Sequence, residues 1–94
     1  MTMKASVKTE HASKYLQQLC KHFAHKVSVQ YTPEKGTVDF GIGDCVIEAN
    51  ENTLSFFCQA EDSVRLEKIE GIITIHLDKF AWREKLEMDW EYSG

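Results

Sequence analysis

Apolar side chains recur along the chain with two different periods, and each period predicts one type of element. Between residues 9 and 26 they recur every three or four positions, which predicts an amphipathic helix that begins after an N-cap at Thr9. Its apolar face consists of Ala12, Tyr15, Leu16, Leu19, Cys20, Phe23 and Ala24. The same spacing predicts a second helix from Asp62 or Ser63 to about Arg83. Its apolar face consists of Leu66, Ile69, Ile72, Ile73, His76, Leu77 and Phe80.

Alternating polar and apolar positions predict six strands, at residues 3–8, 27–31, 37–40, 45–49, 53–60 and 85–92. Short turns join the four middle strands, so these should pair as an antiparallel meander. The last strand should point Leu86, Met88 and Trp90 into the core. The predicted order is β-α-β-β-β-β-α-β. We therefore expect one α+β domain over residues 1–94, with two helices on one face of an antiparallel sheet.

Composition narrows the class of protein. The apolar fraction is 43%, which suits one small domain, and no apolar run approaches the about 18 residues of a membrane span. Residues 1–7 lack the apolar stretch of a signal peptide, and the 3 cysteines form no CxxC pair, so we expect a cytoplasmic protein with reduced cysteines. The net charge of −4 divides into +4 over residues 1–26 and −8 over residues 27–94, which predicts a basic face on the first helix.

His22 and His25 are the candidate metal ligands. They lie one turn apart on the solvent face of the first predicted helix, so they can share one ion. Cys20 lies roughly 140–160° away around that helix and cannot join them. Two imidazoles fall short of the three or four ligands typical of zinc, so a carboxylate from elsewhere or from a second subunit would be needed. A solvated basic face is the alternative interpretation, and the sequence indicates no bound cofactor.

His76 lies on the apolar face of the second predicted helix, between Ile73 and Phe80. A buried imidazole that makes no hydrogen bond costs about 1–3 kcal/mol. We therefore expect either a core histidine bonded to a backbone carbonyl or a strand side chain, or the floor of a pocket between helix and sheet. In the second case Arg83, two turns further on, would bind an anion beside it. His76 and Arg83 are therefore the candidate ligand-pocket residues.

Val64, Ile75 and Trp82 form a second apolar stripe on the second predicted helix, roughly 140° from the centre of its core face. A second apolar stripe on a small domain is typical of a subunit contact. We therefore expect a homodimer that forms through this helix.

Nucleic acid is not an expected partner. The outward positions of the predicted strands include several acidic residues, namely Asp39, Glu48, Glu87, Asp89 and Glu91. Such a face repels phosphate groups. The basic face of the first helix contains few arginines and no interleaved aromatic side chains.

Three motifs resemble those of the bacterial domain-of-unknown-function 2218 family: YLQQLCKHFAHK at residues 15–26, DFGIGDC at residues 39–45, and HLDKFAWRE at residues 76–84, ahead of Trp90. The resemblance runs in order over nearly the whole chain. It implies a small α+β domain similar in its order of elements to the TATA-binding-protein-like fold. Relatives joined to flavin-dependent siderophore-interacting proteins imply a link to iron handling. The family brings no established activity, so no catalytic residues carry over.

These observations predict a small cytosolic ligand-binding or accessory domain, linked through the resemblance to iron or siderophore metabolism. One alternative is a small enzyme that uses His76 with Arg83, or His22 with His25. The chain contains no complete catalytic motif, so the sequence assigns no enzyme class. The other alternative is a structural or protein-interaction module.

Overall fold

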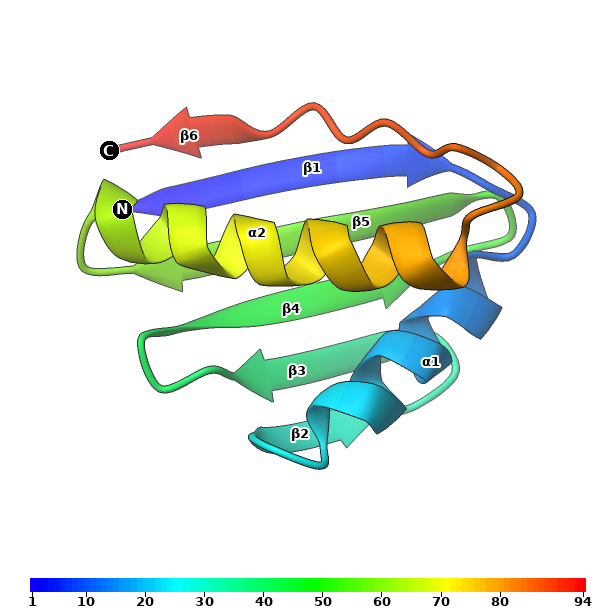
Figure 1. The fold of residues 1–94 in the computed structure, drawn as a ribbon, viewed down its shortest axis with the longest axis horizontal. Coiled ribbons are helices and arrows are strands. Elements are labelled where there is room, and N and C mark those ends of the chain that lie inside the picture. The colour runs from blue at the N-terminus through cyan, green and yellow to red at the C-terminus, as the bar shows by residue number, and fades with distance from the viewer.

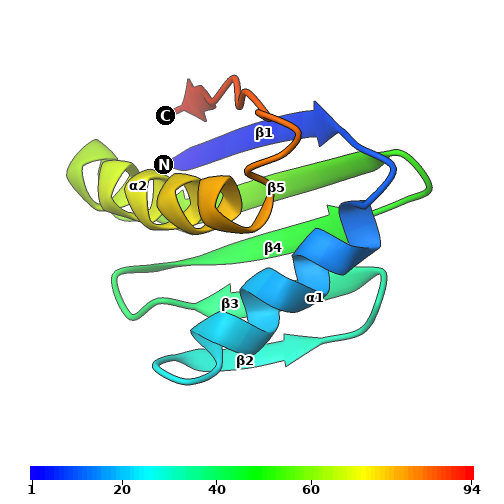
Figure 2. The same cartoon turned by 45° about the vertical axis from the view of Figure 1, so that its right-hand side comes forward.

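The structure is a computed structural model that describes residues 1–94, and it confirms the predicted order of elements (Figure 1). Its elements are β1 (Thr2–Lys8), α1 (Ala12–Phe23), β2 (Ser28–Tyr31), β3 (Lys35–Asp39), β4 (Gly43–Ala49), β5 (Thr53–Ala60), α2 (Ser63–Phe80) and β6 (Glu91–Ser93). Both helices cover the same face of one sheet: α1 crosses β2, β3 and β4, whereas α2 runs along β4 and β5 (Figures 1 and 2). The fold is therefore the predicted two-layer α+β arrangement.

All neighbouring strands of the sheet are antiparallel, in the order β2-β3-β4-β5-β1-β6. The four middle strands form the predicted meander. β1 pairs with β5 over its whole length, from Thr2 opposite Gln59 to Lys8 opposite Thr53. β6 then adds to the other side of β1, where Ser93 lies opposite Thr2. The first and last strands of the chain are therefore neighbours.

The inward side chains of the sheet and the apolar faces of the helices form one core of 19 buried residues. β1 shows the alternation most clearly, because its buried residues are Met3, Ala5 and Val7. The predicted face of α1 is buried except at Ala24, and α2 buries Leu66, Ile69, Ile73 and Leu77. Neither helix is both long and apolar enough to cross a membrane.

α1 approaches the sheet closely at Gly36. A Cβ atom on this residue would lie 2.5 Å from Sγ of Cys20 and 3.3 Å from Cβ of Tyr31. Any larger residue would therefore push the helix and the strand apart. The sequence predicted Gly36 as the last residue of a turn, whereas β3 already begins at Lys35.

α1 is shorter than predicted at both ends. Thr9, the predicted N-cap, is buried ahead of the helix, and its Oγ1 accepts a hydrogen bond from the backbone N–H of His11 at 3.1 Å. The helix therefore begins at Ala12. At the other end, His25 and Lys26 donate to carbonyl groups three positions earlier, so the backbone tightens and the α-helix ends at Phe23.

α2 begins as predicted, because the Asp62 carboxylate caps it by accepting a hydrogen bond from the Arg65 N–H at 2.9 Å. Its predicted end at Arg83 is wrong, since the helix stops at Phe80. The chain then turns through Lys85, whose φ of 50° is incompatible with either helix or strand.

The predicted last strand, residues 85–92, is also wrong in extent. Only Glu91–Ser93 pair with β1, and residues 85–90, which begin at the positive φ of Lys85, form no strand. The predicted alternation is nevertheless confirmed, since Leu86, Met88 and Trp90 pack against the core. The Trp90 ring lies 5.9 Å from the ring of Phe56, measured between centroids.

The carboxylate of Glu84 joins the start of α1 to the segment that follows α2. Oγ1 of Thr9 donates to its Oε1 at 2.8 Å, and the hydroxyl of Tyr15 donates to its Oε2. The bond from Tyr15, and next the bond from Thr9, lower the pKa of Glu84. Burial and the neighbouring carboxylate raise the pKa of Tyr15 to about 12. We call this group the Glu84 bridge.

The Glu84 bridge should contribute measurably to stability. Hydrogen bonds to a charged group contribute about 1.5–3 kcal/mol each, so we expect Tyr15→Phe and Glu84→Ala each to lower the free energy of unfolding by about 1–3 kcal/mol in urea titrations. The double variant should lose less than the sum, because both changes break the same bond. Tyr92→Phe is the matched control, because that hydroxyl donates to Glu70 at 2.8 Å in a hydrogen bond that is exposed to solvent. Strict additivity of Tyr15→Phe and Glu84→Ala would contradict the bridge.

Candidate functional site

A small cavity lies where the end of α1 meets the middle of α2 and the start of the β3–β4 loop. Its volume is about 210 Å³. Its lining is mainly apolar and aromatic, with two imidazoles and one ammonium group; the residues are His22, Phe23, Lys26, Val27, Phe40, Ile72 and His76. An apolar hollow with a few converging polar groups is the usual form of a small-ligand site. We call it the helix cavity.

Two histidines from different helices meet in the helix cavity. The ring centroids of His22 and His76 are 4.6 Å apart, with a tilt of 48° between the rings. Phe23 packs edge-on against both His76 and Phe40, with centroids 5.2 Å apart in each case. Phe80 lies 5.9 Å from His22 on the other side. Aromatic neighbours therefore contact both imidazoles, although His22 is exposed to solvent and His76 is half-buried.

The backbone of α2 fixes the orientation of His76. Nδ1 of the ring lies 2.6 Å from the carbonyl oxygen of Ile72, one turn earlier. A carbonyl only accepts hydrogen bonds, so Nδ1 carries the proton and donates it. This arrangement satisfies the half-buried imidazole, as expected for a core histidine, and leaves Nε2 as the nitrogen available to a ligand.

Positive charge surrounds His22. The pKa of this histidine is lowered, first by loss of hydration and then by His76, Lys79, His25 and Lys26, in that order. His22 is therefore neutral at pH 7, in a region where a bound anion would be favoured.

The structure rearranges the candidate residues taken from the sequence. His76 lies in the helix cavity, where its neighbour is His22 from the candidate metal pair. Arg83 does not line this cavity, since its guanidinium carbon lies 4.8 Å from the centre of the Trp82 ring. His25 does not line the cavity either. No group of three or more histidine, cysteine, aspartate or glutamate side chains is arranged to hold a metal ion.

Reasoning from the sequence missed the other cavity residues, above all Phe40 and Lys26. The spacing of His22 could have indicated its position, because it lies three residues after Leu19 and seven after Tyr15. That spacing puts His22 at the border of the buried face of α1, where a side chain can reach a neighbouring helix. No spacing rule shows which residue of α2 lies opposite.

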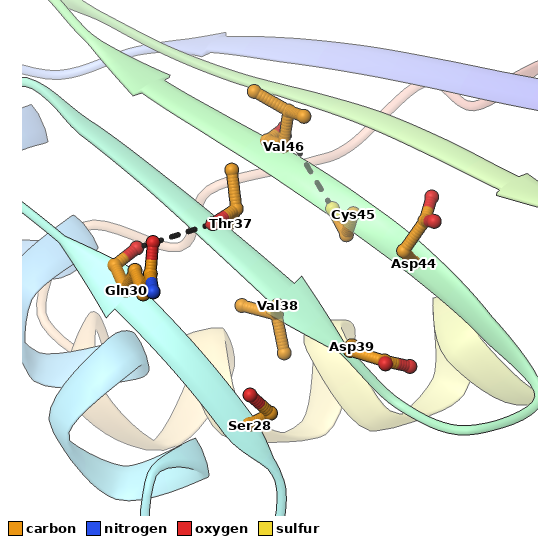
Figure 3. Close-up of a pocket in the computed structure, with 8 residues that line it drawn as sticks. All are labelled: Ser28, Gln30, Thr37, Val38, Asp39, Asp44, Cys45 and Val46. Carbon is orange, nitrogen blue, oxygen red and sulfur yellow. Dashed lines mark hydrogen bonds between the residues drawn. The ribbon is translucent and has the colours of Figure 1, made fainter.

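A second hollow, of about 320 Å³, lies on the face of the sheet that the helices leave open (Figure 3). Asp39 on β3 and Asp44 on β4 lie opposite each other there, and the N–H of Gly41 donates to Oδ1 of Asp39 at 2.9 Å. No basic side chain lines this hollow. The lining residues are Ser28, Gln30, Thr37, Val38, Asp39, Asp44, Cys45 and Val46.

The open face of the sheet is less acidic than the sequence predicted. Asp39, Asp44, Glu48 and Glu91 lie on it, whereas Glu87 and Asp89 fall in the segment before β6, which does not pair with the sheet. Alternation also brings three lysines to this face, namely Lys4, Lys8 and Lys35. Lys35 lies opposite Glu48 and Lys4 opposite Glu91, so much of the charge is balanced locally.

Comparison with known proteins agrees with this description. A family model described as "uncharacterized protein conserved in bacteria (DUF2218)" matches residues 4–91. Among solved structures, the NMR structure of PA4090 from Pseudomonas aeruginosa has a TM-score of 0.81 and 33% sequence identity, over 96% of this chain and 94% of that chain. No curated protein matches the chain. The resemblance seen in the three sequence motifs is thus confirmed.

The lowered pKa of His22 predicts that the protein loses stability in mild acid. Below the ordinary histidine pKa of 6.5, the unfolded chain takes up a proton that the folded His22 resists. The free energy of unfolding should therefore fall as the pH drops from 7.5 to 5, above the range in which carboxyl groups titrate. His22→Gln should flatten this dependence in urea titrations. An equal slope in His22→Gln, or the same flattening in the control His25→Gln, would contradict the assignment.

Proposed function

The chain belongs to the bacterial family of uncharacterized conserved proteins DUF2218, and on that premise we propose that it is a small cytosolic ligand-binding domain whose site is the helix cavity. The observation that carries the proposal is the meeting of His22 and His76, 4.6 Å apart, at a mainly apolar hollow. The three cysteines are free thiols buried in the fold, in keeping with a cytosolic setting.

The ligand class that suits this cavity is a small carboxylic acid with an apolar body. Phe23, Phe40 and Ile72 offer walls that favour a hydrocarbon or an aromatic ring. Lys26 offers a positive charge and hydrogen-bond donors for a carboxylate. The two imidazoles would add donors only by taking up a proton. A volume of about 210 Å³ limits the buried part of the ligand to a few carbon atoms or one ring.

Binding of such an acid would be coupled to uptake of a proton. His76 already donates from Nδ1 to Ile72, so a second proton on Nε2 would turn towards the carboxylate. His22 resists protonation because its neighbours are cationic, and a bound anion would offset that repulsion. Affinity should therefore rise as the pH falls through the range in which His22 takes up a proton.

Metal binding is the second candidate, and one observation favours it. A histidine that ligates a metal usually donates its other ring N–H to a backbone carbonyl or a carboxylate, which is the arrangement of His76. His22 and His76 would then replace the predicted pair His22 and His25. Two protein ligands leave the remaining positions to the bound molecule. The link to iron implied by the family resemblance makes ferrous iron a suitable probe beside zinc and nickel.

The same histidines suit the enzyme alternative, in which the free Nε2 of His76 would act as a general base. Turnover of a carboxylic acid that His76→Gln abolishes, without loss of stability, would favour that alternative.

NMR titration with benzoate tests the proposed ligand class. We expect saturable shifts of the amide signals of the cavity residues with benzoate and much smaller shifts with the uncharged benzamide. Affinity should increase by up to about tenfold per unit of pH as the pH falls from 7.5 to 5.5, as for uptake of one proton. Lys26→Gln and His22→Gln should weaken binding, whereas His11→Gln, at the other end of α1, should not.

Separate outcomes distinguish the candidates. Equal shifts with benzoate and benzamide would exclude recognition of a carboxylate. Calorimetric heat with zinc, nickel or ferrous iron that His76→Gln and His22→Gln each abolish would favour the metal site instead. No response to any of these probes at millimolar concentration would contradict a ligand site in the helix cavity.

A further inference from the structure

The face of α2 that points away from the core has an unusual composition. Val64, Ile75 and Trp82 are 60%, 68% and 66% exposed. Gly71 lies on the same face, and a Cβ atom on it would meet nothing within 4 Å. Glycine weakens a helix relative to alanine, and no contact within the chain requires it here. The face therefore contains apolar side chains and a gap that the single chain does not use.

Two unpaired charges complete this face. Lys68 and Asp78 are both exposed, and neither takes part in any of the ion pairs within the chain. Together with the apolar positions they follow one another at steps of four and three residues; the series is Val64, Lys68, Gly71, Ile75, Asp78 and Trp82. The first five lie within α2, whereas Trp82 lies in the turn that follows the end of the helix at Phe80. This is the spacing of the contact seam of a helix in a coiled coil. We call these six residues the outer seam of α2.

We propose that the outer seam pairs with the outer seam of a second copy of this chain, with the two helices antiparallel about a two-fold axis near Ile73. This inference is independent of the proposed ligand site. In a symmetric antiparallel pair, each residue lies level with the partner residue that is equally far from the axis on the other side. For an axis at Ile73, Val64 faces the partner's Trp82, Lys68 faces the partner's Asp78, and Gly71 faces the partner's Ile75.

Each of these three layers is complementary in chemistry. Val64 against the partner's Trp82 buries two exposed apolar side chains. Lys68 against the partner's Asp78 pairs opposite charges that have no partner within the chain. Gly71 provides open space for the partner's Ile75. By symmetry every layer occurs twice in the dimer.

The same residues disfavour other arrangements. A parallel pair in register would place Lys68 against the partner's Lys68 and Asp78 against the partner's Asp78, and would leave both Gly71 gaps unfilled. A lipid surface would meet Lys68 and Asp78 in the middle of the apolar positions. Only a second copy in the antiparallel arrangement satisfies all six positions at once.

Sedimentation equilibrium of the full chain, from about 10 μM to 1 mM, tests this dimer. We expect a monomer–dimer equilibrium for the natural sequence. Lys68→Asp and Asp78→Lys should each raise the dissociation constant at least about tenfold, because each places two like-charge contacts in the dimer. The double variant with both changes should return to within about threefold of the natural sequence, because reversing both charges restores the pairs. Ile75→Asp should abolish association.

Phe57→Asp is the matched control, because Phe57 is 45% exposed on the opposite face of the molecule, and it should leave the dissociation constant unchanged. Circular dichroism of each variant checks that the fold is retained. A monomer at 1 mM, a dimer that Phe57→Asp abolishes, or a charge reversal that restores nothing would each overturn the proposal.

Discussion

The hydrogen bonds that Thr9 and Tyr15 donate to the carboxylate of Glu84 connect the start of α1 to the segment after α2, and so constrain how the two helices lie on the sheet. They close the helical layer at one end, where the chain enters α1 and leaves α2 (Figure 2). From this point α1 crosses the sheet obliquely while α2 follows the strands. Further along, the contacts of His76 with His22 and Phe23 border the helix cavity. The site depends on this divergence of the helices.

The two faces of α2 differ in burial and composition, although both follow from the same helical periodicity. Its inner face, which includes Leu66, Ile69 and Ile73, is fully buried against the sheet. Along its outer seam, apolar side chains alternate with charged ones. Such a surface favours one specific partner, whereas a continuous apolar face would bind many partners. His76 lies between the two faces, half buried, where a polar ring can bond to the backbone and still reach a ligand.

Periodicity was sufficient to predict the elements, because burial of one face is a local property of the sequence. The strand at Thr53–Ala60 and the start of α2 after Asp62 were predicted correctly on this basis. The errors are at the start of α1 and in the last strand, where local structure overrides the pattern. Thr9 accepts a hydrogen bond from the His11 N–H ahead of the helix, and Lys85 turns the chain with a positive φ. The pairing of His22 with His76 was not predictable, because it depends on the angle between two helices. That angle depends on how each helix packs on the sheet and on contacts between residues far apart in the chain, of which the Glu84 bridge is one.

The close approach of α1 to Gly36 has a consequence for how such a site can change. The Cys20 side chain of the helix lies against Gly36 with no room for a Cβ atom between them, so the height of α1 above β3 is limited at this point. His22 and Phe23 follow Cys20 by less than one turn, so any lift at Gly36 would carry them with it. Single substitutions of the lining residues can change the shape, charge and ring orientations of the helix cavity. Its depth is tied to Gly36, which lies outside the cavity lining, so a change of depth would need a rearrangement of the helix on the sheet.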